Sequence, residues 1–269
     1  GVDLMHDQMK PLGFGQITGI DILGESRGVL PSTEWKRNTY KKPEQQRWYS
    51  GETISLGIGQ GYNNFTMLQI AHAMGTVANN GLKMKPHLVR EVVDVETKAS
   101  TLVAKEPVGQ LPLLPENLEV IKKGMIGVNV EGTSATSFVG AQYVSAGKTG
   151  TAQVFTVKQN EKYNASTIDE RMRDHALFVA FAPADDPKVA LAMVVENAGF
   201  GAQNAAPIAR RVFDFVIMGQ YPSQEDIEAV QKGQATRPVG KPRPLASMPW
   251  PPKAITLPDE PVLDDSLER

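Results

Sequence analysis

The sequence from Ala176 to Val195 reads ALFVAFAPADDPKVALAMVV, which is two apolar runs with turn-forming residues between them. The runs, Ala176–Ala182 and Val189–Val195, each have the length of a buried β-strand. The residues that join them, Pro183-Ala184-Asp185-Asp186-Pro187, are typical of a tight turn, because proline fixes φ and aspartate bonds to its own backbone. A short connection joins strands of opposite direction, so this stretch predicts an antiparallel hairpin.

Helical patterns precede the hairpin. Thr66-Met67-Leu68-Gln69 fits a capping box, in which the Thr hydroxyl and the Gln amide each satisfy an unpaired backbone N–H. The helix that it opens is expected to end at Asn79-Asn80-Gly81. A second helix is expected from Pro115, and a short third one near Gly132-Thr133-Ser134-Ala135.

One more helix follows the hairpin, from Pro207 to Met218. Its apolar residues recur at helical spacing, so they are expected to form one buried face. They are Ile208, Val212, Phe215 and Val216.

Further strands are predicted from Pro86 to Glu96 and from Thr151 to Val157, and Ser100–Val108 is either a partner of the first or a loop. No stretch of about 20–50 residues repeats, which argues against a solenoid or a propeller. The elements together predict an α+β fold with an antiparallel sheet packed between helices.

The composition excludes several classes of protein. The net charge of −2 on 269 residues gives no basic field, which argues against a nucleic-acid partner. Without cysteine there is no disulfide framework, thiolate metal site or cysteine nucleophile. The four histidines have no ligand-like spacing, so we expect no metal and no cofactor. The apolar runs are far shorter than the roughly 18 residues of a membrane span.

Two stretches have alternative interpretations. Residues 31–51 interleave aromatic and basic side chains, which could stack on and neutralise a nucleic acid strand. The acidic balance of the whole chain favours a solvated loop whose rings pack back on the domain. Residues 53–61, TISLGIGQG, end in a Gly-rich turn but lack the GxGxxG spacing and the Lys-Ser/Thr pair of a phosphate loop. We therefore reject a nucleotide site there.

The composition changes after Gly219. Nine of the 19 prolines lie between Tyr221 and Arg269, in a stretch with few aliphatic residues and an acidic end. Such a segment buries too little apolar surface to offset the entropy lost on ordering. We therefore predict a folded domain over residues 1–219 and a disordered or extended tail over residues 220–269.

The motif that carries chemistry is Lys148-Thr149-Gly150-Thr151, immediately before a predicted alternating strand. An edge strand with these residues presents a cation and two hydroxyls, and its glycine lets a substrate lie close to the backbone. A peptide with a terminal carboxylate could add to this edge as a further strand. The backbone N–H after the glycine could then stabilise an oxyanion. The alternative interpretation is a surface turn before a strand.

Several other stretches stand in a fixed order along the chain: Gly19-Ile20-Asp21, Leu30-Pro31-Ser32-Thr33-Glu34-Trp35-Lys36, Trp48-Tyr49-Ser50-Gly51-Glu52-Thr53, Gly57-Ile58-Gly59-Gln60-Gly61-Tyr62, Lys148–Val154, Asp174–Phe178 and Phe181-Ala182-Pro183. Together they resemble the transpeptidase domain of class B penicillin-binding proteins, in particular those of the cell-elongation type. The resemblance covers about residues 1–218. Within it, the Lys-Thr-Gly-Thr tetrapeptide matches the third motif of the penicilloyl-serine transferases, a group that includes the β-lactamases.

Two motifs of this family are missing. The family uses a serine nucleophile with a lysine one helical turn further on, and a Ser-x-Asn or Ser-x-Asp motif for proton transfer. Here only Ser145-Ala146-Gly147-Lys148 spells Ser-x-x-Lys, and it lies where a loop meets a strand, so its two side chains do not share a face. In the family both motifs precede the position of Gly1. We therefore expect the C-terminal part of the transpeptidase domain, with a remnant of its helical subdomain, no nucleophile and no activity by itself.

The resemblance implies a peptidoglycan D,D-transpeptidase that acts on D-Ala-D-Ala stem peptides and is acylated by β-lactams. Lys148 would supply positive potential and a hydrogen bond, and Thr149 and Thr151 would bind the substrate carboxylate. Gly150 would allow close approach, and the Thr151 N–H would be an oxyanion donor. The resemblance also implies membrane partners in cell elongation and a place at the periplasmic face of the bacterial inner membrane.

Two alternatives stay open. A non-catalytic module of this fold could bind a peptide or a partner without chemistry, as the missing serine suggests. A D,D-carboxypeptidase or a β-lactamase would share the Lys-Thr-Gly signature. The tryptophan-containing segment before residues 57–61 favours a transpeptidase over the second alternative.

Overall fold

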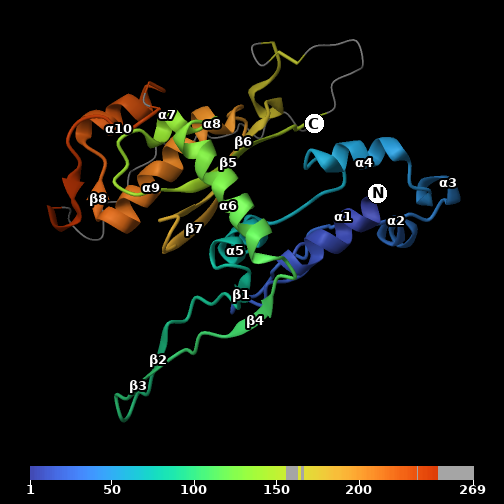
Figure 1. Ribbon diagram of the computed structural model, residues 1–269, viewed down its shortest axis with the longest axis horizontal. Helices are drawn as coiled ribbons and strands as arrows, with labels where there is room; N and C mark the ends of the chain where they lie inside the picture. Colours follow the sequence, from blue (N-terminus) through green and yellow to red (C-terminus); the bar gives the residue numbers. More distant parts are fainter. Residues whose placement is uncertain (156–162, 165–166, 235, 248–269) are drawn as a thin grey trace, which may run out of the picture.

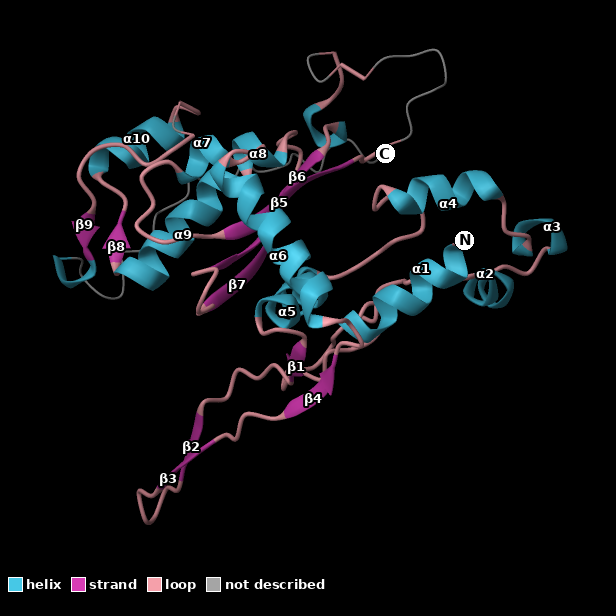
Figure 2. Cartoon of the chain, viewed as in Figure 1, coloured by secondary structure: helices cyan, strands magenta, loops and turns pink. Residues whose placement is uncertain are grey.

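The computed structural model describes residues 1–155, 163–164, 167–234 and 236–247 (Figure 1 and Figure 2). The α-helices are α1 Val2–Met9, α2 Thr33–Thr39, α3 Pro43–Gln46, α4 Ser50–Gly57, α5 Met67–Ala78, α6 Pro115–Val130, α7 Ala135–Phe138, α8 Gly201–Asn204, α9 Ala206–Met218 and α10 Gln224–Gln231. The strands are β1 Leu82–Met84, β2 Glu91–Val93, β3 Ser100–Leu102, β4 Pro107–Gln110, β5 Ala146–Ala152, β6 His175–Ala182, β7 Val189–Val195, β8 Gln220–Tyr221 and β9 Arg243–Pro244. Within these ranges no helix has the length and apolar character that crossing a bilayer requires.

A three-stranded antiparallel sheet in the order β5-β6-β7 forms the centre of the fold. Its β6–β7 pair is the predicted hairpin, with Ala176 opposite Val195 and Ala182 opposite Val189. Helices α5 and α6 cover one face of the sheet, and α8 and α9 cover the other (Figure 2). The predicted α+β fold, with an antiparallel sheet between helices, is confirmed.

Alternate residues of β6 enter two different hydrophobic cores. Phe178 and its even-numbered neighbours pack with Ala209 and Phe213 of α9. Phe181 packs on the opposite face with Ala78 of α5. Successive strand side chains point to opposite faces, so a sheet covered on both sides requires the continuous apolar run that the sequence shows. Each fully buried phenylalanine stabilises the fold by about 1.5–3 kcal/mol.

Helix α9 lies where the last helix was predicted, but it buries a different face. Ile208 and Val216 are 40% and 51% exposed, whereas Ala209, Arg210 and Phe213 are buried. The prediction of the buried side was therefore wrong. Small alanines let the helix approach the sheet closely, and the hydrogen bonds of the arginine allow its burial, whereas apolar spacing selects only large side chains.

The capping box at the start of α5 is confirmed. Thr66 Oγ1 accepts from the Gln69 amide at 3.1 Å, and Gln69 Oε1 accepts from the Thr66 amide at 2.9 Å. Asn80 and Gly81, with φ of 54° and 84°, end the helix in the left-handed region, as expected. Helix α6 begins at the predicted Pro115.

The strand predicted from Pro86 to Glu96 is much shorter in the structure. Only β2 forms a ladder, and it pairs with β3, which answers whether Ser100–Val108 is a partner or a loop. This hairpin projects from the body of the molecule, and the side chains of both strands are exposed (Figure 1). A two-stranded ladder without a packed face is only marginally stable, which limits its length.

Residues 31–51, predicted to be a solvated loop whose rings pack back on the domain, instead form α2, α3 and the start of α4, but the rings do pack inward, with Trp35 and Trp48 against Tyr62. Lys36, which is 3% exposed, organises this segment. Its ammonium pairs with the Glu52 carboxylate and lies 5.3–5.4 Å from the ring centroids of Trp48, Tyr49 and Tyr62. A buried ammonium needs a carboxylate partner and is attracted to aromatic faces, so these side chains fold around one another.

The disordered or extended tail predicted from residue 220 is wrong for the residues that the structure describes. Helix α10 packs beside α9 through a bidentate ion pair between Arg211 and the fully buried Asp226, at 2.7 and 2.8 Å. Ser223 caps α10 by accepting from the Asp226 amide, and Asp226 also accepts from the Val239 amide. This segment buries little apolar surface, as the sequence indicated, but charged hydrogen bonds stabilise its packing on α9 instead. Residues 248–269 lie outside the described residues, and the boundary at residue 219 stays a prediction.

Candidate active site

The Lys-Thr-Gly-Thr motif lies inside β5 and not before a strand. The strand predicted from Thr151 to Val157 ends at Ala152, and its last two residues lie outside the described ranges. The ladder pairs Lys148 with Val179, Thr149 with Phe178 and Thr151 with Ala176. Pairing with the long apolar strand β6 therefore makes β5 begin at Ala146, five residues before the alternating pattern in the sequence begins at Thr151.

Two hydrogen bonds show which way the backbone points at the motif. The Thr149 carbonyl accepts from Lys148 Nζ at 2.8 Å, and the Thr151 carbonyl accepts from Gln60 Nε2 at 3.3 Å. Both carbonyls therefore point away from β6, toward the other edge of β5. In an antiparallel strand the N–H and C=O of one residue point to the same side, so the amides of Thr149 and Thr151 face this edge too. Among the described residues, no strand pairs with that edge.

Helix α8 presses against the backbone of the motif from the α9 side. A Cβ on Gly201 would lie 2.5 Å from the Gly150 oxygen and 3.1 Å from its nitrogen, and it would also overlap the Leu177 oxygen. Only glycine permits this approach. The first turn of α8 therefore fixes the position of Gly150 at the centre of the motif.

A loop after α6 contacts the first hydroxyl of the motif. Thr133 Oγ1 lies 3.1 Å from Thr149 Oγ1, and either hydroxyl can donate. Lys148 and Thr151 are exposed, and Thr149 is partly exposed, so a ligand can reach all three side chains.

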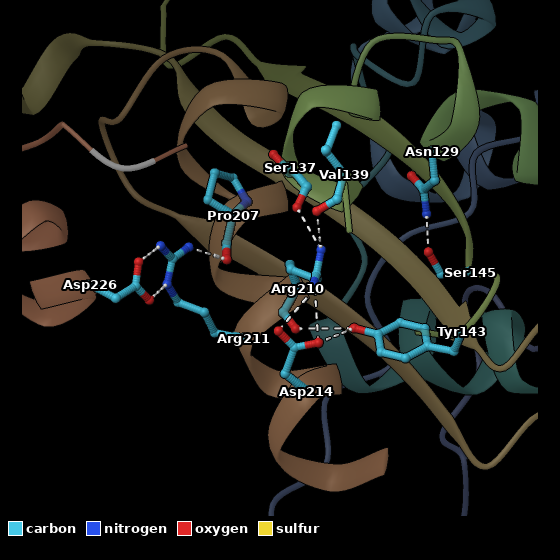
Figure 3. A network of polar contacts seen from close by, with 10 residues as sticks. All are labelled: Asn129, Ser137, Val139, Tyr143, Ser145, Pro207, Arg210, Arg211, Asp214 and Asp226. Atoms are coloured by element: carbon cyan, nitrogen blue, oxygen red, sulfur yellow. Dashed lines mark hydrogen bonds and ion pairs between the residues drawn. The ribbon is translucent and has the colours of Figure 1, made fainter. Parts of the chain in front are cut away.

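Ser145, the serine of the only Ser-x-x-Lys spelling in the chain, is 3% exposed. Its Oγ accepts from Asn129 Nδ2 at 2.9 Å (Figure 3). Asn129 Oδ1 accepts from the hydroxyl of buried Ser134 at 2.6 Å. Ser145 immediately precedes β5, so Lys148, three residues on, projects to the opposite face. This serine connects α6 to β5 and is not placed as a nucleophile.

A second polar network ties α7 to α9 (Figure 3). The buried Arg210 guanidinium donates to the Asp214 carboxylate at 2.8 and 2.9 Å and to the Ser137 and Val139 carbonyls at 3.3 and 3.1 Å. Tyr143 donates to the same carboxylate at 2.8 Å. Burial and the nearby Asp214 charge raise the pKa of the Tyr143 phenol, so it stays a donor. The network therefore holds the α7 region on α9.

His72 has a structural environment. Its Nε2 lies 2.6 Å from the Met84 carbonyl oxygen, and burial lowers the pKa of the imidazole. Within the described ranges, no group of three or more histidine, aspartate or glutamate side chains could hold a metal ion.

A comparison with protein families identifies the fold. Residues 1–214 match the family model described as penicillin binding protein transpeptidase domain. The chain belongs to this family. The resemblance to penicillin-binding transpeptidase domains that was inferred from the sequence is therefore confirmed.

Relatives and solved structures agree with the family. The peptidoglycan D,D-transpeptidase MrdA of Haemophilus influenzae is 42% identical over 235 residues, which is 84% of this chain and 34% of the relative. A crystal structure of Pseudomonas aeruginosa PBP2 in complex with WCK 5153 has a TM-score of 0.64 and 38% identity, over 80% of this chain and 43% of that one. The Helicobacter pylori PBP2–MreC complex gives a TM-score of 0.63 and 26% identity, over 81% of this chain and 36% of that one. The chain spans about a third of the length of the curated relatives it matches.

The sequence interpretation placed Lys148, Thr149, Gly150 and Thr151 together, and the structure puts them on one strand. It missed three residues that contact this strand, namely Gln60, Thr133 and Gly201. Two of them lie in stretches that the sequence analysis noted for another reason: Gln60 in the Gly-rich turn of residues 57–61, and Thr133 in the helix start of residues 132–135. No signal pointed to Gly201. Nothing in their spacing indicates a contact with β5.

Proposed function

We propose that this chain supplies the substrate-binding strand of a penicillin-binding peptidoglycan D,D-transpeptidase. The observation that carries the proposal is the edge of β5 with which no strand of the described residues pairs, where the Thr151 N–H and C=O point outward beside Lys148 and Thr149. The printed activity of the 42% identical relative supports the same reaction.

The geometry supports roles for Lys148, Thr149 and Thr151 of the motif. A stem peptide ending in D-Ala-D-Ala would lie along the free edge of β5 as an added strand. Its terminal carboxylate would accept from the Thr149 and Thr151 hydroxyls and lie near the Lys148 ammonium. The Thr151 N–H would donate to the carbonyl oxygen of the peptide bond that breaks, and removing such a donor typically costs about 10²–10³ in rate.

The chemical step needs a serine that the described residues do not place at this edge. In the proposed acylation, the serine oxygen bonds to the penultimate D-Ala carbonyl carbon, the C–N bond breaks, and the serine proton leaves on free D-Ala. An amine of a neighbouring peptidoglycan strand then bonds to the same carbonyl carbon, the bond to the serine oxygen breaks, and a proton of the amine returns to that oxygen, which leaves the cross-link and the free serine. A β-lactam would take the place of the first substrate, and its ring would open onto the same oxygen.

We extend the proposal to location and partners. The Helicobacter pylori PBP2 structure is a complex with MreC, which supports a similar partner, of the cell-elongation machinery, for this protein. A place at the periplasmic face of the inner membrane, where peptidoglycan is assembled, follows from the proposed substrate.

One observation favours the alternative of a non-catalytic binding module. The only Ser-x-x-Lys in the chain has its serine buried against Asn129. Such a module would bind a D-Ala-D-Ala peptide through the same edge without forming a covalent bond. The two functions therefore differ in one measurable property, which is acylation.

Labelling with a fluorescent penicillin separates them. The full-length protein that contains this chain should give a labelled band that survives denaturing electrophoresis, whereas this chain alone should not. Lys148→Ala should slow labelling of the full-length protein by about 10²-fold or more, because it removes the cation beside the ligand carboxylate and the positive potential at the site. Lys188→Ala is the matched control, since Lys188 is an exposed turn residue paired with Asp186, and it should label normally. Unlabelled full-length protein, or normal labelling of Lys148→Ala, would contradict the proposal.

A further inference from the structure

The C-terminal end of α6 and the turn that follows it are hydrogen-bonded to β5 and to the residue just before it. Asn129 bonds Ser145 immediately before the strand, and Thr133 reaches Thr149 in the middle of the motif. Because the two contacts lie four residues apart along the chain of β5, they fix both the position and the direction of this part of the edge.

The turn that carries Thr133 is rigidly built. A Cβ on Gly132 would lie 2.7 Å from Val128 Cα, so only glycine allows the chain to fold back over α6 there. On the other side, Ser134 is 1% exposed, and its hydroxyl lies 2.6 Å from Asn129 Oδ1 and 3.1 Å from the Val128 carbonyl. Thr133 is held between these two anchored residues. The anchored turn therefore holds the Thr133 hydroxyl at the position where it contacts Thr149.

Hydrogen counting decides the direction of the Thr133–Thr149 bond when an anion is bound. A carboxylate can only accept, and a hydroxyl has a single hydrogen. If the Thr149 hydrogen is donated to the ligand carboxylate, the bond between the two threonines requires Thr133 to be the donor. Donation by Thr133 also polarises the Thr149 hydroxyl, which strengthens the bond that Thr149 gives to the carboxylate.

We propose that Thr133 is a positioning residue that orients and polarises the Thr149 hydroxyl for recognition of the substrate carboxylate. The proposal rests on the proposed function, because it takes the carboxylate of a D-Ala-D-Ala peptide or a β-lactam as the ligand at this edge. Thr133 acts through Thr149 and does not itself contact the ligand.

Acylation kinetics of the full-length protein test the proposal with two ligands, benzylpenicillin and its methyl ester, which lacks the carboxylate. Thr133→Val should lower the second-order acylation rate constant for benzylpenicillin about threefold to tenfold, the value of one neutral hydrogen bond. The same substitution should change the rate with the ester by less than about twofold. Thr133→Ser, which keeps the hydroxyl, should restore the rate with benzylpenicillin.

A double substitution distinguishes action through Thr149 from an independent effect. Thr149→Val should cost more than Thr133→Val, and Thr133→Val/Thr149→Val should be no slower than Thr149→Val alone. The proposal is overturned by equal losses with both ligands, by multiplied losses in the double variant, or by an unchanged rate in Thr133→Val.

Failure of the proposed function would be recognised separately, as no acylation of the unsubstituted protein by either ligand. The role of Thr133 is then decided by equilibrium binding of acetyl-D-Ala-D-Ala and its C-terminal amide, measured by calorimetry. Thr133→Val must weaken binding of the acid and leave binding of the amide unchanged. Any other result, including no binding of the acid, refutes the role of Thr133.

Discussion

Replacing Gly201 by alanine tests whether α8 fixes the active strand. The new Cβ would lie 2.5 Å from the Gly150 oxygen and would also overlap the Leu177 oxygen, whereas ordinary contacts begin near 3.4 Å. Both oxygens belong to the backbone of the sheet. Neither can rotate away as a side chain would. Helix α8 or β5 must therefore move by about 1 Å, a type of overpacking that costs about 1–3 kcal/mol.

Two measurements on the full-length protein should change together. A loss of about 1–3 kcal/mol lowers Tm by about 3–10 °C in a domain of this size. A displacement of about 1 Å at a site of oriented donors can slow the reaction about 100-fold, so labelling by fluorescent penicillin should fall by one to two orders of magnitude. A variant whose Tm falls but which is acylated at the normal rate would show that α8, and not β5, has moved.

The matched control is Gly124→Ala. Gly124 lies in the middle of α6, and a Cβ there would meet nothing within 4 Å. This substitution should stabilise the protein by about 0.5–1 kcal/mol, because alanine loses less backbone entropy than glycine in a helix. The reasoning is refuted if Gly201→Ala leaves both Tm and acylation at their original values, or if both substitutions have the same effect.

The remaining predictions concern stability. Arg211→Met should cost about 3–5 kcal/mol locally, because it leaves the Asp226 carboxylate buried without its cation, and hydrogen exchange of the α10 amides should accelerate. Arg211→Met/Asp226→Leu should recover most of that protection, and slow exchange in the single variant would contradict the role of the pair. Burial lowers the pKa of folded His72 from 6.5, so the stability that this group contributes is present above pH 6.5 and is lost as pH falls through its folded pKa. His72→Gln should therefore reduce the drop in Tm between pH 7 and pH 5, and an unchanged drop would assign the acid sensitivity to another group.

The sheet was predictable because its signals are local. The apolar runs in β6 and β7, the turn between them and the capping box of α5 each depend on neighbouring residues only. The Lys-Thr-Gly-Thr motif was recognised for the same reason, since its residue types lie side by side on one strand.

The errors at residues 31–51 and in the tail have a different origin, which is pairing between residues far apart in the chain. Lys36 folds residues 31–51 by meeting Glu52 and three rings, and Asp226 fixes α10 by meeting Arg211. An inference from composition treats such charged residues as exposed to water, because it contains no information about their partners in the fold. Their burial depends on partners that only the folded chain brings within hydrogen-bond distance.

By itself, then, the order of residues determined the hairpin, the main helices and the tetrapeptide with its cation and hydroxyls. Tertiary structure alone decided which edge of β5 lacks a partner among the described strands, which carbonyls point outward to Gln60 and to the Lys148 ammonium, and that Thr133 and Gly201 contact the motif. The physical reason is that secondary structure depends on contacts a few residues apart. The geometry of the edge depends on where α6 and α8 are packed against the sheet.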